Sequence, residues 1–242
     1  MSVRLFEFIY GMDDSEQKKS LNKDLSDQRR EYGRYALRRE ALAPDPIDQF
    51  AIWYQDAEQL LDGYPNPVTL STVDESGAPY SRVVLLKSFS ADGFVFYTNY
   101  QSKKAQHISH NKSVALLFFW EQLERQIHIQ GIAEQHSSKE ADSYFASRPR
   151  KSQLSAWASS QSEPISSRQT LEEAYQKFEK KFENQDVPRP PNWGGYLIRP
   201  KAFEFWQGQE SRLHDRFTYN NFSYTKKQSS SEIEWHIERL SP

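Results

Sequence analysis

Hydrophobic and polar residues change their spacing several times along the chain, and each change predicts an element. After Pro44 and Pro46, hydrophobic residues recur at helical spacing, which predicts a helix to about Leu61. Three short alternating segments follow, separated by turns that contain Gly77 and Gly93, and they predict an antiparallel meander. These segments cover residues 68–73, 80–88 and 94–98.

The second half of the chain continues with further helices and strands. A short helix capped by Ser102 is predicted over 101–111, and Ser137 with Glu140 forms a capping box before a helix that Pro149 ends. Because strands cluster rather than alternate regularly with helices, we expect a mostly β fold, an antiparallel barrel with helices packed outside. An amphipathic helix is predicted over 167–184, and strands over 113–120, 126–134, 196–199, 203–207, 216–219 and 232–240.

Length and composition limit the domain organisation and the compartment. The 242 residues suit one domain, and we expect a flexible arm over 1–25 before a single domain over 26–242. The absence of Cys excludes disulfides and thiolate metal sites. His107 and His110 lack a third ligand, so we expect a solvated helix face and no metal. No apolar stretch reaches the roughly 20 residues of a membrane helix and no secretory pattern is present, so the expected compartment is the cytoplasm.

Cationic segments predict phosphate binding by side chains. The glycine patterns of nucleotide-binding loops are absent, so Arg, Lys, Tyr and Ser are the expected ligands. If residues 212–216 are extended, Arg212, His214 and Arg216 point the same way, and an anion would relieve their mutual repulsion. A solvated edge strand explains this segment equally well.

The predicted strand over 80–88 carries a cation near each end, Arg82 and Lys87. Because an odd number of positions separates them, a flat strand directs them to opposite faces. Both reach one ligand only if the strand bends, and otherwise each extends from the sheet to water.

A further cluster joins the end of the third strand to the start of the next helix. Tyr97 and Thr98 offer hydroxyls, while Lys103 and Lys104 place ammonium groups in a first helical turn, where cations oppose the helix dipole. A docked phosphate would account for them, and an exposed turn is the alternative. Residues 144–153 add three cations in a basic loop. Together these clusters predict phosphorylated small-molecule ligands.

The same segments, taken in order, resemble the pyridoxamine 5′-phosphate oxidase family. One such stretch would be weak, but all of them occur in the family's order over about 190 residues. The stretches are Arg-Arg-Glu-Tyr at 29–32, Arg-Val-Val-Leu-Leu-Lys at 82–87, Phe-Tyr-Thr-Asn at 96–99, Leu-Glu-Arg-Gln at 123–126, Tyr-Phe-Ala-Ser-Arg-Pro-Arg at 144–150, Gln-Ser at 161–162, Trp-Gly-Gly at 193–195, and Glu-Phe-Trp-Gln-Gly through Arg-Leu-His-Asp-Arg within 204–216.

The resemblance implies an FMN-binding split barrel and a homodimer with FMN sites at the subunit interface. FMN contacts are implied for Arg82, Val83, Val84, Leu85, Leu86, Lys87, Tyr97, Thr98, Lys103, Lys104, Gln126, Gln161, Ser162, Trp206 and Arg216. Substrate contacts are implied for Lys87, Tyr144, Arg148, Ser152, Arg212, Leu213 and His214, and a mobile lid for Arg29, Arg30, Glu31 and Tyr32.

The implied reaction oxidises pyridoxamine or pyridoxine 5′-phosphate to pyridoxal 5′-phosphate, with hydride transfer to flavin N5 and with O2 reduced to hydrogen peroxide. Arg212 and His214 are the implied catalytic residues over the pyridine ring.

The chain departs from the family pattern at two places. Lys103 stands where the family often has Arg, which keeps the charge but loses the bidentate fork. Tyr64 precedes Pro65 where the family often has an acidic residue, so any proton handling there would fall to Asp62.

Three other functions compete with this one. A split-barrel flavin oxidoreductase of other specificity would be expected to lack the substrate-side residues, which are all present here. A non-catalytic carrier of FMN or pyridoxal phosphate would use the same residues as the enzyme, so the sequence does not separate the two. A nucleic-acid binder using the basic stretch 29–39 is the weakest alternative, because the formal net charge is −2.

Overall fold

The computed structural model describes residues 25–27, 31–221 and 234–242. The chain divides into two compact units, residues 1–31 and 32–242, and the fold given below is that of the second. The expected arm over 1–25 lies almost wholly outside the described residues, as do Arg29 and Arg30. Within the described residues, no helix is long and apolar enough to cross a membrane.

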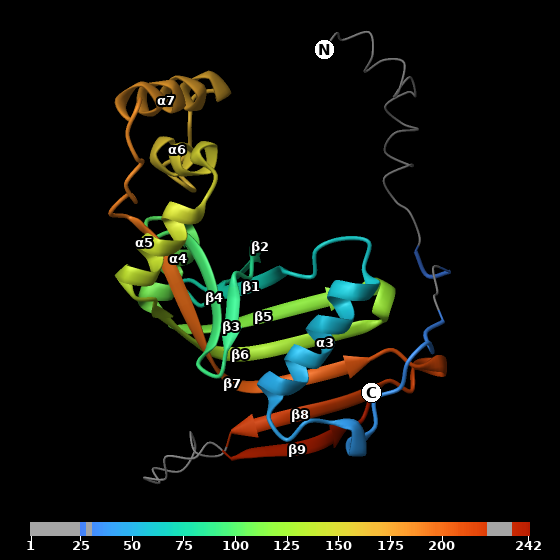
Figure 1. Cartoon of the computed structure of the whole chain (residues 1–242). Helices are drawn as coiled ribbons and strands as arrows, with labels where there is room; N and C mark the ends of the chain where they lie inside the picture. Colours follow the sequence, from blue (N-terminus) through green and yellow to red (C-terminus); the bar gives the residue numbers. More distant parts are fainter. Residues whose placement is uncertain (1–24, 28–30, 222–233) are drawn as a thin grey trace, which may run out of the picture. The chain divides into compact units, whose positions relative to one another are not determined.

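The described part of the second unit contains one curled sheet of nine antiparallel strands (Figure 1). The order along the sheet is β2-β1-β5-β6-β7-β4-β3, and β8 and β9 extend it from β7. The mostly β fold with helices outside is therefore confirmed. The strands are β1 (Pro67–Val73), β2 (Pro79–Leu85), β3 (Ser88–Ser90), β4 (Gly93–Asn99), β5 (Ser113–Trp120), β6 (Arg125–Gln135), β7 (Trp193–Gln207), β8 (Asp215–Asn221) and β9 (Trp235–Leu240).

The long strand β7 connects the two parts of the sheet. One edge of β7 pairs with β6, while the other edge pairs with β4 along its first half and with β8 along its second half. Between the halves the register with β6 shifts, since Gly131 pairs with Pro200 and Gln130 with Ala202. Lys201 is therefore the extra residue of a β-bulge.

The bulge explains why the sequence predicted two strands, 196–199 and 203–207, where one exists. Pro200 interrupts the pattern, because proline is tolerated in a strand mainly at edges and bulges. The extra residue also lets Ile198 and Phe203 both enter the core, although an odd number of positions separates them.

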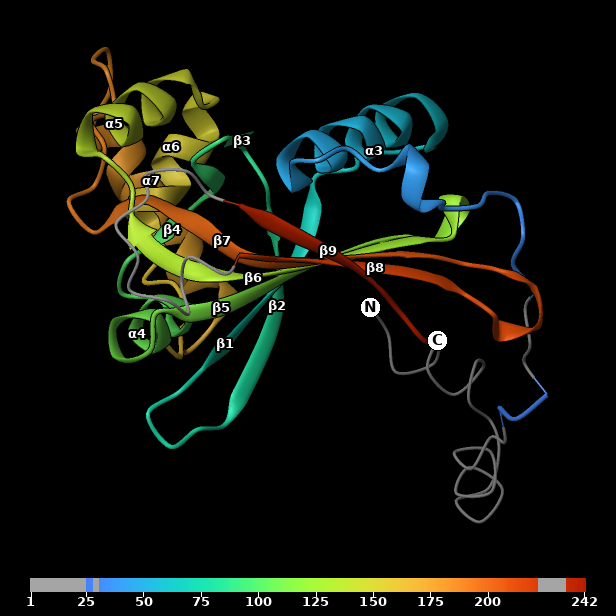
Figure 2. The same cartoon turned by 90° about the horizontal axis from the view of Figure 1, so that it is seen from below.

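Helix α3 (Pro46–Leu60) lies across one face of the sheet and covers the core, as Figure 2 shows from below. Asp45 caps its N-terminus, since Oδ1 accepts a hydrogen bond from the Ile47 amide at 2.7 Å, and Pro46 opens the first turn. Phe50 is fully buried and packs edge-on against Phe94 at 4.9 Å between ring centroids. The predicted first helix is confirmed.

The remaining helices gather near β4 and the first half of β7. They are α4 (Lys103–His110), α5 (Ser138–Ser147), α6 (Arg150–Ala158) and α7 (Arg168–Lys181), with short 3-10 helices at Arg39–Ala41 (η1), Glu121–Leu123 (η2) and Glu210–Arg212 (η3). The predicted capping box is present, because Ser137 Oγ accepts from the Glu140 amide and donates to the Glu140 carboxylate. The loop expected over 144–153 is wrong: Pro149 ends α5 and is also the N-cap of α6.

The predicted meander is correct in its first hairpin; its third strand occurs as β4, but the expected pairing of that strand with β2 is wrong. β1 and β2 pair along their whole lengths, but β4 pairs with β3 and β7. Pairing of β2 with β1 ends at Leu85. The next amide, that of Leu86, donates to the Asn66 carbonyl before β1, and the Lys87 amide donates to the Val95 carbonyl of β4. The chain therefore bends here, and Lys87 lies beside β4 instead of β1.

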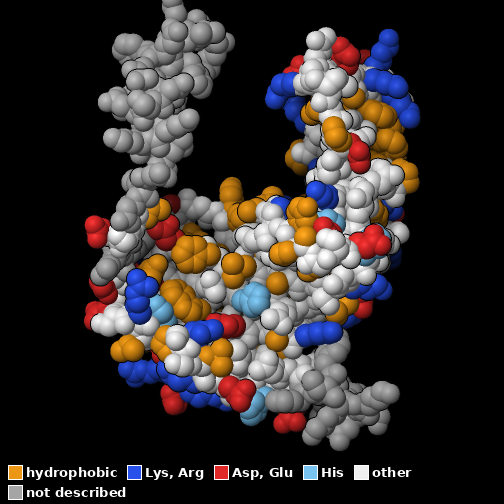
Figure 3. Space-filling model, turned by 180° about the vertical axis from the view of Figure 1, so that it is seen from behind, with side chains coloured by type: hydrophobic (Ala, Val, Ile, Leu, Met, Phe, Trp, Pro, Cys, Tyr) orange, Lys and Arg blue, Asp and Glu red, His pale blue; other side chains and the backbone are white. Residues whose placement is uncertain are grey.

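The face of the sheet opposite α3 leaves hydrophobic side chains exposed, and Figure 3 views the molecule from that side. Val83 is 65% exposed, Phe119 53% and Leu85 46%. By strand alternation these three side chains point away from the core residues of the same strands.

Candidate functional site

A pocket of about 530 Å³ lies among β2, β4, α4, α5 and α6, a volume typical of small-molecule sites. It brings together eleven of the predicted site residues: Val83, Val84, Leu85, Lys87, Tyr97, Thr98, Lys104, Tyr144, Arg148, Ser152 and Gln161. Its other lining residues, which the sequence analysis missed, include Asn99, Ser155, Ser159 and Trp193. Trp193 begins the Trp-Gly-Gly motif, which was the available signal for it.

Lys104 places a buried ammonium group at this pocket. Its Nζ donates to Thr98 Oγ1 at 3.1 Å, to Ser102 Oγ at 3.1 Å and to Gln161 Oε1 at 3.3 Å. Burial, and then the nearby positive charge of Arg82, together lower the pKa of Lys104 to about 8. Among the described residues no carboxylate lies within ion-pair distance of Nζ, so the group is suited to receive an external anion.

The start of α4 differs from the prediction in one detail. Ser102 occupies the N-cap position, but its side chain makes no capping hydrogen bond and instead accepts from Lys104. The Lys103 amide donates to Ser162 Oγ at 3.2 Å, and the Lys103 ammonium lies 4.5 Å from the centroid of the Tyr80 ring. Lys103 and Ser162 thus lie beside the pocket without lining it.

Arg82 is held on the core side of β2 by neighbouring oxygens. Its Nη1 donates to the Leu70 carbonyl at 2.9 Å and to Thr72 Oγ1 at 2.8 Å, and burial lowers its pKa. Thr72 Oγ1 also lies 3.0 Å from Nδ1 of His107, which is buried rather than part of a solvated face. Arg82, Thr72 and His107 thus form one polar network beside the pocket.

A second unpaired cation at the pocket is Arg148. Its guanidinium lies over the ring of Trp193, 4.7 Å from the centroid, and its Nη1 is buried without a hydrogen-bond partner among the described residues. Burial lowers its pKa. The rings of Tyr97 and Tyr144 stack at 4.1 Å, and Tyr97 stacks on Trp193 at 5.4 Å, so one wall of the pocket is aromatic.

The other predicted residues form a second cluster at the far end of β7. Strand register places Gln126, Trp206 and Arg216 side by side across β6, β7 and β8. His214 packs on Trp206 with ring centroids 4.6 Å apart, and Tyr32 meets both rings edge-on at 5.8 and 6.0 Å. Leu213 is 71% exposed beside them, whereas Leu86, the remaining predicted contact, is buried in the core.

The protonation of His214 follows from one contact. The Gln209 amide donates to His214 Nδ1 at 3.1 Å, so the neutral ring carries its proton on Nε2. Burial, and then the charge of Arg212, lower the pKa of His214. His214 is therefore an uncharged Nε2 hydrogen-bond donor near neutral pH.

The extended geometry predicted for residues 212–216 is wrong at its start. Arg212 ends the 3-10 helix η3, and Ser211 and Arg212 both have left-handed backbones, with φ of 52° and 61°. β8 begins at Asp215, so of Arg212, His214 and Arg216 only Arg216 lies in a strand. Arg216 is already paired, since its Nε donates to Glu204 Oε1 at 2.8 Å.

One chain does not bring the two groups of residues together. Trp193 at the pocket and Trp206 in the second cluster lie at opposite ends of β7, about 40 Å apart along an extended strand. Each group is therefore half of the predicted site.

This topology is that of split-barrel proteins. A solved structure of PhzG from Burkholderia lata 383, in complex with tetrahydrophenazine-1-carboxylic acid, matches with a TM-score of 0.76 at 24% identity over 87% of this chain and 100% of its own. A pyridoxamine 5′-phosphate oxidase-related, FMN binding protein from Nostoc punctiforme matches with a TM-score of 0.63 at 16% identity, covering 83% of this chain and 100% of its own. At these identities the likenesses show the fold alone.

Sequence comparison then places the chain within that class. A family model described as pyridoxamine 5′-phosphate oxidase matches residues 55–182, and one described as the pyridoxine 5′-phosphate oxidase C-terminal dimerisation region matches residues 193–242. A pyridoxine/pyridoxamine 5′-phosphate oxidase from Photobacterium profundum is 50% identical over 219 residues, 90% of this chain and 100% of its own. One from Rubrobacter xylanophilus is 51% identical over 197 residues, 81% of this chain and 91% of its own. The chain belongs to the pyridoxamine 5′-phosphate oxidase family.

Proposed function

We propose that the protein oxidises pyridoxamine 5′-phosphate or pyridoxine 5′-phosphate to pyridoxal 5′-phosphate, using FMN and O2. The main supporting observation is that two desolvated cations, Lys104 and Arg148, line one pocket. Among the described residues, no carboxylate lies within ion-pair distance of either. Burying a charge without a partner is unfavourable, and two phosphate esters would supply the missing anions. The names of the relatives from Photobacterium and Rubrobacter support the same reaction.

FMN fits the side of the pocket around Lys104. Lys104 and the backbone and side chains at the end of β2 would hold the cofactor, while Arg82, Lys103 and Ser162 add polar groups beside them. When bound, FMN supplies a hydride acceptor at N5 and passes the electrons to O2. The protein's own contribution is to bind, orient and desolvate the two ligands.

The substrate phosphate fits the other side of the pocket. Arg148 directs an unpaired N–H into a buried position, and Tyr144, Ser152 and Lys87 line the same space. Arg212 and His214 would lie over the pyridine ring, with neutral His214 offering its Nε2 hydrogen.

A second copy of the chain would complete this site. The exposed hydrophobic face opposite α3 provides a surface for it (Figure 3), and β7 to β9 lie within residues 193–242, which the dimerisation-region model matches. In a two-fold dimer, each pocket can receive the second cluster of the partner, called the Arg212 cluster below because it includes Arg212 beside His214. The length of β7 keeps this cluster far from the pocket of its own chain.

The direct test is turnover under air. Purified protein should be yellow and should convert pyridoxamine 5′-phosphate to an aldehyde with formation of peroxide, while pyridoxamine without the phosphate should be a much poorer substrate. Without oxygen, the substrate should bleach the flavin. A yellow protein that the substrate does not bleach would instead be a carrier, and bleaching only by an unphosphorylated compound would indicate another specificity.

FMN affinity should depend on pH through Lys104. The free site has a depressed Lys104 pKa of about 8, and a bound phosphate dianion favours the charged ammonium and raises that pKa. Binding therefore takes up a proton above pH 8, and the affinity should fall as the pH rises, by up to about tenfold per unit. Flavin fluorescence titrations from pH 7 to 9.5 would measure this.

The matched control for this pH dependence is Lys104→Met, which should bind FMN weakly at every pH, with no fall in affinity above pH 8.

The stability of the protein without FMN should change with pH in the opposite sense. Because the folded pKa is depressed, Lys104 lowers stability below pH 8 and ceases to do so as the pH rises towards 10.5. If FMN affinity or stability depended on pH identically in wild type and Lys104→Met, Lys104 would not be the titrating group at the FMN phosphate.

A further inference from the structure

The turn between β5 and β6 carries a buried carboxylate that none of the roles above uses. Glu124 ends this turn with a left-handed backbone, φ 55° and ψ 38°, and only 3% of its side chain is exposed. Such a backbone is unfavourable for a residue other than glycine. A buried charge in a strained backbone is retained where the surrounding contacts require it.

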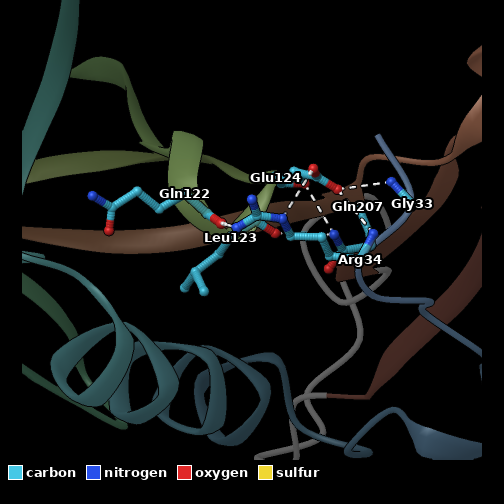
Figure 4. A network of polar contacts seen from close by, with 6 residues as sticks. All are labelled: Gly33, Arg34, Gln122, Leu123, Glu124 and Gln207. Carbon is cyan, nitrogen blue, oxygen red and sulfur yellow. Dashed lines mark hydrogen bonds and ion pairs between the residues drawn. The ribbon is translucent and has the colours of Figure 1, made fainter. Parts of the chain in front are cut away.

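The carboxylate of Glu124 binds the backbone of a distant segment (Figure 4). Oε2 accepts hydrogen bonds from the Gly33 amide at 2.8 Å and from the Arg34 amide at 3.2 Å. The Arg34 guanidinium lies 4.0 Å from Oε1, but its side chain is 63% exposed, so that ion pair is weak. The backbone amides are therefore the main partners of the charge.

The backbone of the same turn is fixed from the other side. The Glu124 carbonyl accepts from the Gly208 amide at 2.7 Å and from Gln207 Nε2 at 3.1 Å. Gln207 is 1% exposed, and its Oε1 accepts from Arg125 at 3.0 Å. The turn is thus tied to the end of β7, directly after Trp206.

These contacts determine where Tyr32 lies. A Cβ atom at Gly208 would come within 2.8 Å of Tyr32 and 3.1 Å of Glu124, so only glycine allows this approach. Tyr32 directly precedes the two amides that Glu124 binds, and its ring rests on Trp206 and His214.

We infer that Glu124 is a positioning residue for the cluster of Trp206 and His214, which would lie over the pyridine ring of the substrate: its carboxylate anchors residues 33 and 34 and so holds Tyr32 against His214 and Trp206. This inference rests on the proposed function, since it assigns Glu124 an effect on substrate binding. Glu124 itself contacts neither ligand and acts through Tyr32. The implied FMN contacts at this end of β7, Gln126, Trp206 and Arg216, are held in place by strand pairing, and Lys104 lies at the other end of β7, so FMN affinity should not depend on Glu124.

A double-mutant cycle tests this coupling. Glu124→Ala should raise KM for pyridoxamine 5′-phosphate about tenfold, the size expected for losing charge-assisted hydrogen bonds, with FMN affinity unchanged. In a Tyr32→Ala background the same substitution should change KM less than about twofold, because the residue it positions is absent. Glu124→Gln, which keeps one acceptor oxygen, should fall between wild type and Glu124→Ala.

Arg34→Ala is the matched control, because it removes the exposed charge and leaves both amides in place; KM should stay within about twofold of wild type. Hydrogen exchange of the Gly33 and Arg34 amides gives a readout independent of turnover, and it should accelerate in Glu124→Ala but not in Arg34→Ala.

Additive effects of Glu124→Ala and Tyr32→Ala, or unchanged exchange at residues 33 and 34, would overturn the inference. Reduced FMN binding in both Glu124 variants would also overturn it, by showing a general structural role. A wild-type protein without oxidase activity would refute the proposed function instead, and the exchange measurement would still report on the anchor.

Discussion

Replacing Arg212 by Ala should lower kcat/KM for pyridoxamine 5′-phosphate about 100- to 1000-fold, the loss typical of removing a preorganised charged donor from a reacting centre. Ser211 and Arg212 hold consecutive left-handed backbones, which cost about 1–2 kcal/mol each. Strain of this kind persists where it serves a site, and here it presents the guanidinium beside His214. Steady-state kinetics with FMN content measured in parallel would check this.

The matched control is Arg168→Ala, which removes an 89% exposed guanidinium on α7 and should leave kcat/KM unchanged. Arg212→Lys keeps the charge but loses the planar fork, so it should recover only part of the activity. A loss of less than about threefold in Arg212→Ala would remove Arg212 from the reacting centre.

Mixing two inactive variants should restore activity that neither has alone. If each site combines the pocket of one chain with the Arg212 cluster of its partner, a dimer of one Arg148→Ala chain and one Arg212→Ala chain has one intact site and one doubly substituted site. Random exchange of subunits makes half of the dimers mixed, so about a quarter of all sites should work. Activity and dimer composition after co-expression would measure this.

The control mixture combines Arg148→Ala with Lys104→Met. Both residues lie in the pocket of the same chain, so every site in every dimer keeps one substitution and no activity should return. Failure of the first mixture to recover, despite proven mixed dimers, would show that each site is completed within one chain.

Local sequence patterns predicted most elements because their causes are local. β5 was predicted at residues 113–120 and occurs there, since turns bound it on both sides and its alternation is regular. The capping box at Ser137 and the proline start of α3 likewise depend on neighbours within one helical turn. Such signals are read directly from the chain.

Predictions failed where distant parts of the chain decide the structure. β4 pairs with β7 from the far end of the chain, a partner that no local pattern indicates. The left-handed backbone at Arg212 breaks an alternation that looked extended, because neither Ser211 nor Arg212 is a residue type typical of that conformation.

The site was predicted as a set of residues but not as an arrangement. The resemblance named both the Lys104 pocket and the Arg212 cluster, yet only the length of β7 shows that one chain keeps them apart. Glu124 lay within the matching stretch 123–126, where only Gln126 was assigned a role. Its partners are backbone amides some 90 positions away, which leave no trace in side-chain patterns.

The bulge at Lys201 also sets the phase of β7. Deleting that single residue would leave Ile198 and Phe203 an even number of positions apart, so a regular strand without the bulge would still direct both into the core and keep Trp206 on its present face. A one-residue deletion can therefore be accommodated at the bulge, whereas the same deletion elsewhere in β7 would turn every side chain beyond it to the opposite face of the sheet.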